Sequence, residues 1–192
     1  MIAAASFDTL NDALYELKND KIIVVPTDTV HGLVCPAKPD ILGNLYKIKK
    51  RDPDKPFSLL FSDLLMVEEC FVLPLEQQSL LKKYLPGPFT FLIKNNNKFK
   101  WVTDTDKIGI RIPDYTFLTR LISSLGMPLL STSANISGEG DITDTEKLIE
   151  VFEQKVPLIL FDKKIKHSPS TIVDLTYSPF KIIRQGAGKF EG

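Results

Sequence analysis

The feature that most constrains this chain is the alternation of short, β-branched apolar runs with segments of helical periodicity. Residues 7–18 place Leu10, Ala13, Leu14 and Leu17 on one face at helical spacing. The run KIIVV over residues 21–25 then follows and is stopped by Pro26, which is typical of a buried strand. Repeated along 192 residues, this order predicts an α/β fold whose strands are covered on both faces.

The same reasoning locates the other elements. Asp114 is a candidate cap for a helix that carries apolar residues from Phe117 to Leu125, and Thr143 with Glu146 forms a candidate capping box for another. Further helices are expected over residues 39–50 and 75–85, and strands over 57–61, 89–94, 107–112, 128–133, 157–161, 171–175 and 180–184.

Strands 89–94 and 107–112 follow each other without a helix between them, so the alternation is not strictly βαβ. We therefore expect a twisted, mixed sheet with helices on its faces. The sequence contains no internal repeat and no Gly/Ser linker, which predicts a single domain over residues 1–192.

Composition narrows the class of protein. Lys plus Arg equals Asp plus Glu at 24 each, so the chain lacks the basic excess of proteins that bind nucleic acid through phosphates. No apolar run approaches the roughly 18 residues of a membrane span, and the N-terminal segment does not resemble a signal peptide. We expect a cytoplasmic protein with no membrane contact. Cys35 and Cys70 have no motif spacing and are expected to be buried thiols, and two histidines predict no metal site built from protein ligands.

Hydroxyl and cationic side chains recur where the predicted strands end. Thr29 follows the first strand, residues 131–133 end another, and Ser170 precedes a third. Because ligands of open α/β sheets bind at strand ends, these residues should meet in one site. The cations expected there are Lys49, Arg51, Lys55, Arg111 and Arg184. This set predicts a pocket for a polyanionic small molecule, with a nucleotide as the natural candidate.

Simpler interpretations exist for each residue. Lys49 to Arg51 could complement the dipole of a helix C-terminus, Arg111 could form a structural ion pair, and the serines and threonines could be turn hydroxyls. The segment from Gly186 to Lys189 mimics the end of a P-loop, but Ile183 stands in place of its first glycine, so we reject a P-loop.

Seven segments also carry a family resemblance. In chain order they are PTDTVHGL, KIKKRDPDKP, PGPFTF, IGIRIP, STSANISG, PSTIVD and IIRQGA. Together they resemble the threonylcarbamoyl-AMP synthase (YrdC-like) family in its short, single-domain form. The resemblance implies a YrdC-like fold and a basic cavity that holds ATP and L-threonine.

The resemblance also assigns residues. Thr29, Arg111, Ser131 and Ser170 would surround L-threonine. ATP would contact Lys49, Arg51, Lys55, Ser133, Asn135 and Arg184, and the residues closest to the chemistry would be Lys49, Arg51, Arg111 and Ser133. Two positions depart from the family pattern: His31 stands where tyrosine is usual, and Leu60 where some long members have histidine.

The implied reaction joins L-threonine, bicarbonate and ATP into threonylcarbamoyl-AMP, with Mg²⁺ entering on ATP. The product would supply the downstream machinery that transfers the threonylcarbamoyl group to tRNA. Two alternatives stay open. One is a carbamoyl-adenylate-forming relative, and the other is an RNA- or ribosome-binding module of the same fold without catalysis, including weak direct RNA contact.

Overall fold

Ten strands form one continuous sheet in the computed structural model, which describes residues 1–50, 57–165 and 168–191. The strand order is β1-β8-β2-β3-β7-β4-β6-β5-β9-β10. The bounds are β1 Ile2–Ala4, β2 Ile23–Val25, β3 Gly32–Pro36, β4 Ser58–Leu60, β5 Phe89–Lys94, β6 Lys107–Arg111, β7 Leu129–Ser133, β8 Ile159–Phe161, β9 Thr171–Asp174 and β10 Lys181–Arg184.

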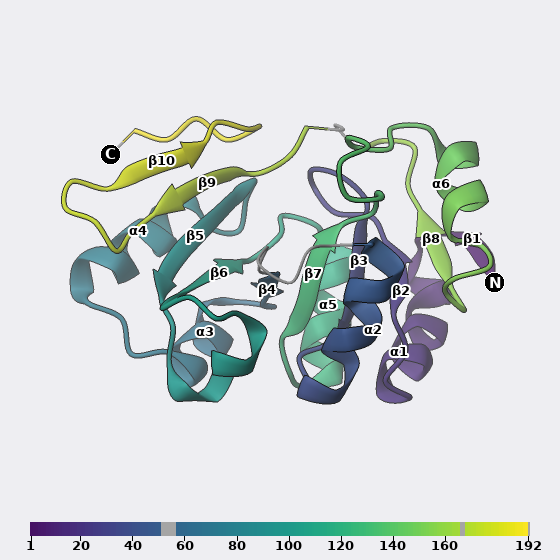
Figure 1. The fold of residues 1–192 in the computed structure, drawn as a ribbon, viewed down its shortest axis with the longest axis horizontal. Helices are drawn as coiled ribbons and strands as arrows, with labels where there is room; N and C mark the ends of the chain where they lie inside the picture. The colour runs from purple at the N-terminus through teal and green to yellow at the C-terminus, as the bar shows by residue number, and fades with distance from the viewer. Residues whose placement is uncertain (51–56, 166–167, 192) are drawn as a thin grey trace.

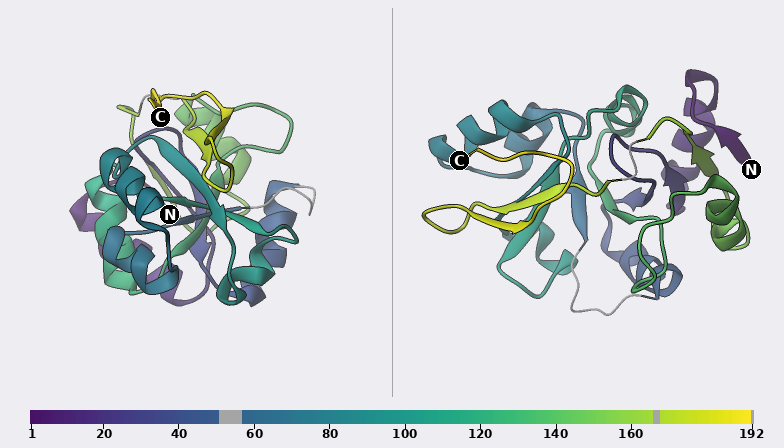
Figure 2. Two further views of the ribbon diagram at one scale, coloured as in Figure 1. Left: turned by 90° about the vertical axis from the view of Figure 1, so that its left-hand side faces the viewer. Right: turned by 90° about the horizontal axis from the view of Figure 1, so that it is seen from above.

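The sheet is mixed, as expected. Pairs β1–β8, β2–β8, β4–β6 and β5–β9 are parallel. The remaining neighbours, including β3–β7 and β9–β10, are antiparallel. The first and last strands lie at opposite ends of the sheet, and the β9–β10 hairpin projects from one of those ends (Figures 1 and 2).

Helices bury both faces of the sheet. Residues of one strand alternate between two apolar clusters: Ile23 and Val25 face α1 (Leu10–Lys18) and α5 (Thr116–Leu125), while Val24 faces the other side. That other side packs against α2 (Pro39–Lys49), α3 (Leu64–Cys70), α4 (Leu75–Tyr84) and α6 (Thr145–Phe152). Helices α2 and α5 accordingly lie on opposite sides of the sheet (Figure 1). Within the described residues, none of the helices has the length and apolar character needed to cross a bilayer.

The sequence located most elements to within two residues of their observed bounds but missed several short ones. It gave no signal for β1, β3, α3 or the 3-10 segment Asn97–Val102. Strand β3 was missed because the motif PTDTVHGL looks like a loop, whereas its last residues are buried and pair with both β2 and β7.

Both predicted helix caps are wrong by one residue. Helix α5 begins after Tyr115, without a side-chain cap, and Asp114 is not its N-cap. Helix α6 is capped by Asp144, whose carboxylate accepts a hydrogen bond from the Lys147 backbone N–H, so Thr143 and Glu146 form no capping box. Both cysteines are buried free thiols, as expected. Burial raises the pKa of the Cys35 thiol to about 12.

Candidate active site

A cavity of about 200 Å³ opens among the central strands. It is lined by residues of β4, β5, β6, β7, β9 and β10, together with the loop between β2 and β3. The sequence-predicted residues among its lining are Thr29, Arg111, Ser131, Ser133, Ser170 and Arg184. The fold therefore brings these side chains from five separate motifs to one place.

Arg111, the last residue of β6, is held from one side of its guanidinium. One terminal nitrogen donates to Asp28 Oδ1 at 2.5 Å and to Thr29 Oγ1 at 2.9 Å. The two side chains of the ion pair are only 9% and 10% exposed. Arg111 Nε has no partner among the described residues. The ion pair thus fixes the guanidinium in the cavity lining, where it can bind a planar anion. We call Asp28, Thr29 and Arg111 the Arg111 wall.

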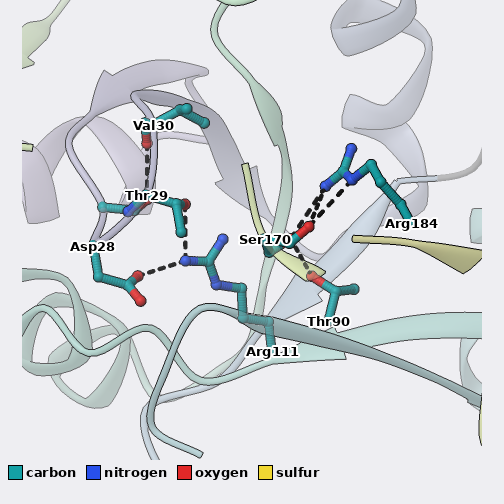
Figure 3. Close-up of polar contacts among 8 residues, drawn as sticks. Asp28, Thr29, Val30, Thr90, Arg111, Ser170 and Arg184 are labelled. Carbon is teal, nitrogen blue, oxygen red and sulfur yellow. Dashed lines mark hydrogen bonds and ion pairs between the residues drawn. The ribbon is translucent and has the colours of Figure 1, made fainter. Parts of the chain in front are cut away.

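Arg184, the last residue of β10, meets the opposite side of the cavity. Its Nε and a terminal nitrogen donate to the Ser170 carbonyl at 3.1 and 2.8 Å. The Ser170 hydroxyl in turn lies 2.9 Å from Thr90 Oγ1. Figure 3 shows the Arg111 guanidinium between the Asp28–Thr29 pair and this second group. We call Thr90, Ser170 and Arg184 the Arg184 wall.

The two arginines influence each other electrostatically. Burial is the main cause that lowers the pKa of Arg111; the charge of Asp28 opposes this, and the charge of Arg184 adds to it. Burial also lowers the pKa of Arg184, against the charge of Asp141. Both guanidinium groups stay protonated at neutral pH because their ordinary pKa lies so far above it. Two cations that repel each other across a cavity favour an anion between them.

Lys49 ends helix α2 and is 1% exposed. Its ammonium donates to the Ser133 carbonyl at 2.5 Å, to Ser133 Oγ at 3.3 Å and to Asn135 Oδ1. Ser133 Oγ also donates to Asn135 Oδ1 at 2.7 Å. A lysine on a solvated helix end would not be buried in this way, so the helix-dipole interpretation fails for Lys49. It brings a fixed positive charge against the end of β7.

Strand β7 carries both serines, at positions two apart, toward the cavity. Ser131 pairs with Val34 of β3 and with Ser58 of β4, and Ser133 pairs with Gly32. The space beside them depends on glycine: a Cβ on Gly109 would lie 2.8 Å from Ser58 Oγ. Glycine inside the apolar strand at 107–112 was a readable signal of such a close approach.

Sequence reasoning missed several lining residues, and of the two positions that depart from the family pattern only one lines the cavity. Thr27, Ser58, Thr90 and Asp141 line the cavity but were not singled out. Leu60 lines it, whereas His31 is 3% exposed and accepts a hydrogen bond at 3.3 Å from the Asp162 backbone N–H, outside the lining. The predicted residues Arg51 and Lys55 lie outside the described residues.

Carboxylates are sparse at this site. Among the described residues, Asp141 is the one carboxylate in the cavity lining. The same residues contain no group of three or more His, Cys, Asp or Glu side chains that could hold a metal ion. This donor set would suit a Mg²⁺ that enters with a bound nucleotide, and Asp141 is the lining carboxylate that could contact it.

Comparison with known proteins places this chain in a family. The Sua5/YciO/YrdC family, described as "Telomere recombination", matches residues 16–186. The threonylcarbamoyl-AMP synthase of Vibrio parahaemolyticus is 31% identical over 187 residues, which cover 93% of this chain and all of that protein.

Solved structures agree. Escherichia coli YciO superposes with a TM-score of 0.88 at 26% identity, covering 98% of this chain and 95% of that one. Pyrococcus abyssi Sua5 complexed with L-threonine superposes with a TM-score of 0.90 at 25% identity, covering 97% of this chain and 57% of that one. The chain is an α/β protein of the Sua5/YciO/YrdC family, with a YrdC-like fold.

Proposed function

We propose that the protein is an L-threonylcarbamoyladenylate synthase, a nucleotidyltransferase that forms threonylcarbamoyl-AMP and pyrophosphate from L-threonine, bicarbonate and ATP. The observation that carries the proposal is the pair of arginine walls facing one cavity, with buried Lys49 beside it. A relative of this family has been captured with L-threonine, and same-sized relatives carry the synthase name. E. coli YciO, of nearly the same size, carries no activity in its name, so the activity needs its own test.

The chemistry requires two anions to meet. The threonine amine adds to bicarbonate with loss of water to give a carbamate, and a carbamate oxygen attacks the α-phosphorus of ATP. The bond from the α-phosphorus to the bridging oxygen breaks, and pyrophosphate leaves. Both reacting partners are negative, so positioning and charge neutralisation are the main demands on the protein.

In this proposal Arg111 receives the amino acid and Arg184 receives ATP. Arg111 and Thr29, with Ser131 and Ser170, receive the amino acid, because a guanidinium binds a carboxylate through two parallel N–H groups. Lys49, Ser133, Asn135 and Arg184 receive ATP, with Lys49 as a compact positive charge near the phosphates. Lys49, Arg51, Arg111 and Ser133 would act closest to the reacting atoms, and Arg51 and Lys55 would add charge. No side-chain nucleophile is needed.

Mg²⁺ bound with ATP would neutralise phosphate charge. Asp141, the carboxylate in the lining of the described residues, would contact it. The product would pass to the machinery that transfers the threonylcarbamoyl group to tRNA, which is in keeping with the proposed cytoplasmic location.

The decisive experiment measures pyrophosphate release and adenylate formation from ATP, Mg²⁺, L-threonine and ¹⁴C-bicarbonate. We expect pyrophosphate only in the complete mixture, together with a labelled adenylate. Reactions that lack threonine, lack bicarbonate or contain L-alanine serve as controls. Equal release without threonine would contradict the proposal and indicate a different adenylating or hydrolytic activity.

A non-catalytic RNA-binding module is the competing function. It predicts no pyrophosphate release and retention of tRNA on a filter at moderate salt. The charge balance of 24 basic and 24 acidic residues argues against it, because phosphate-backbone binding depends on excess positive charge.

A further inference from the structure

The segment that follows β10, residues 185–191, lies outside the cavity yet contacts the chain directly behind it. The Ala187 backbone N–H donates to the Pro169 carbonyl at 2.8 Å. The Gly186 backbone N–H donates to Thr171 Oγ1 at 2.9 Å, and the Thr171 hydroxyl donates to the Gly188 carbonyl. We call residues 185–191 the C-terminal strap.

Two glycines bring the strap unusually close to the sheet. A Cβ on Gly186 would lie 2.2 Å from the Pro169 carbonyl oxygen and 2.5 Å from the Ser170 carbonyl carbon. A Cβ on Gly188 would lie 2.5 to 2.8 Å from atoms of the Phe89 ring. Backbone therefore packs against backbone at Pro169 and Ser170, which line the cavity.

The far end of the strap is anchored separately. The Phe190 ring lies 5.1 Å from the Tyr84 ring, between centroids, and also contacts Phe89 and Phe91. The Tyr84 hydroxyl donates to the Glu191 carbonyl at 2.6 Å and accepts from the Glu191 N–H at 3.0 Å. Because both ends are held, the strap has a fixed path past the start of β9.

Thr171 is the residue that joins this path to the site. It is fully buried, it is absent from the cavity lining, and its hydroxyl contacts the strap two residues after Arg184. Strand β9 is held independently by its ladder with β5 and by the Thr171 N–H, which donates to the Pro88 carbonyl at 2.9 Å. Loss of the Thr171 hydroxyl would therefore remove the hydrogen bonds that hold the strap at Gly186 and Gly188, next to Arg184, while β9 and the adjoining Ser170 keep their place.

We infer that Thr171 is a positioning residue for nucleotide binding: its hydroxyl clamps the C-terminal strap and thereby sets where the Arg184 guanidinium meets the cavity. This inference rests on the proposed function for the identity of the ligand, since ATP is the anion assigned to Arg184. Positional errors of about 1 Å in a binding group can cost on the order of a hundredfold in rate, so a clamp outside the cavity can govern the site.

The test uses the full chain and four variants. Thr171→Val keeps the side-chain shape but removes the hydroxyl, and Thr171→Ser keeps the hydroxyl. Gly186→Ala displaces the strap without removing a polar group. Gly43→Ala is the matched control, because a Cβ on Gly43 meets nothing within 4 Å. Calorimetry measures ATP and threonine binding, and steady-state assays give KM for each substrate.

We expect Thr171→Val and Gly186→Ala to weaken ATP binding and raise KM for ATP about tenfold, the equivalent of one or two lost hydrogen bonds. KM for threonine should stay within about twofold, and Thr171→Ser and Gly43→Ala should match the parent. A purely structural role would lower the unfolding midpoint without separating the two KM values, and that result would overturn the inference.

The outcomes also separate this inference from the proposed function. If the parent makes the adenylate and Thr171→Val binds ATP normally, the positioning role alone is wrong. If the parent binds ATP but makes no threonylcarbamoyl-AMP, and Thr171→Val still weakens ATP binding, the proposed function is wrong and the clamp stands. A parent that binds no ATP overturns both. Should Thr171→Val fail to fold, Gly186→Ala decides the question alone.

Discussion

The two arginine walls solve the same problem by different means. Arg111 comes from a central strand, is buried with its partner, and is oriented by an ion pair at 2.5 Å with Asp28. Arg184 comes from the edge strand β10, is exposed as a residue although its guanidinium is partly buried, and is oriented by the carbonyl of Ser170. A buried cation needs a counter-charge, whereas an exposed one can be aimed by neutral acceptors. The Arg111 wall should therefore couple ligand binding to stability, and the Arg184 wall should not.

The largest effect is expected from Arg111→Ala. It leaves the Asp28 carboxylate buried without its partner, which should cost about 3–5 kcal/mol of unfolding free energy and abolish threonine binding. Urea unfolding and threonine calorimetry measure the two losses.

The double variant Arg111→Ala with Asp28→Ala is the control. It should recover much of the stability but none of the threonine binding, because no buried charge is then left unpaired. If Arg111→Ala alone were as stable as the parent, the proposed difference in stability contribution between the two walls would be wrong.

Ser133→Val tests the hydroxyl beside Lys49. Valine suits a strand and exchanges the hydroxyl for two methyl groups, a small increase in size, so the protein should fold like the parent. We expect adenylate formation to fall about a hundredfold, as when one preorganised hydrogen-bonding group is lost. Pyrophosphate release measures the rate, and unchanged thermal unfolding is the control. Full activity would place the end of β7 outside the active site.

Arg184→Ala should separate binding from stability. Because the side chain is exposed, we expect the unfolding free energy to change by less than about 1 kcal/mol, while ATP binds about tenfold more weakly. Urea unfolding and ATP calorimetry provide the comparison with Arg111→Ala. Equal stability losses for both arginines would contradict the contrast.

The smallest effect is expected for the stability at low pH of Asp174, on the strand β9 that pairs with the strand carrying Arg184. Burial alone would raise the pKa of Asp174 on β9, but hydrogen bonds from Lys107 and Thr176 outweigh it and lower that pKa below 3.8. The folded pKa is thus below the unfolded one. The stabilisation is present above about pH 4 and is lost as the pH falls through the folded pKa. Parent and Asp174→Asn should differ in unfolding free energy at about pH 6, and urea unfolding should show the difference shrinking as the pH falls below about 4.

How far the sequence predicts this molecule depends on the scale of the feature. Helix α5 and strands β5 and β6 were readable because their apolar periodicity persists over several turns or residues. Strand β3 could not be predicted, because the polar segment PTDTV that precedes it is typical of a loop, although β3 pairs with a strand on each side.

The same holds at the site. Arg111, Ser133 and Arg184 could be predicted to meet, since strand ends gather ligands. The partner of Arg111 could not, because Asp28 and Arg111 lie far apart in the chain and only the completed sheet joins them. Arg51 and Lys55 stay predictions.

The order of strands in the sheet has a consequence for how the chain assembles during synthesis. Ile2 pairs with Ile159, and Phe89 pairs with Thr171. Strands β1 and β5 are therefore synthesised well before β8 and β9, the strands with which they pair in parallel. At translation rates of about 5–20 residues per second, β1 has no partner for several seconds after it leaves the ribosome. Pairing between distant segments is also intrinsically slow, since loop closure precedes any gain from contact. Until β8 and β9 have been synthesised, the unpaired edges of β1 and β5 must therefore be kept from aggregating.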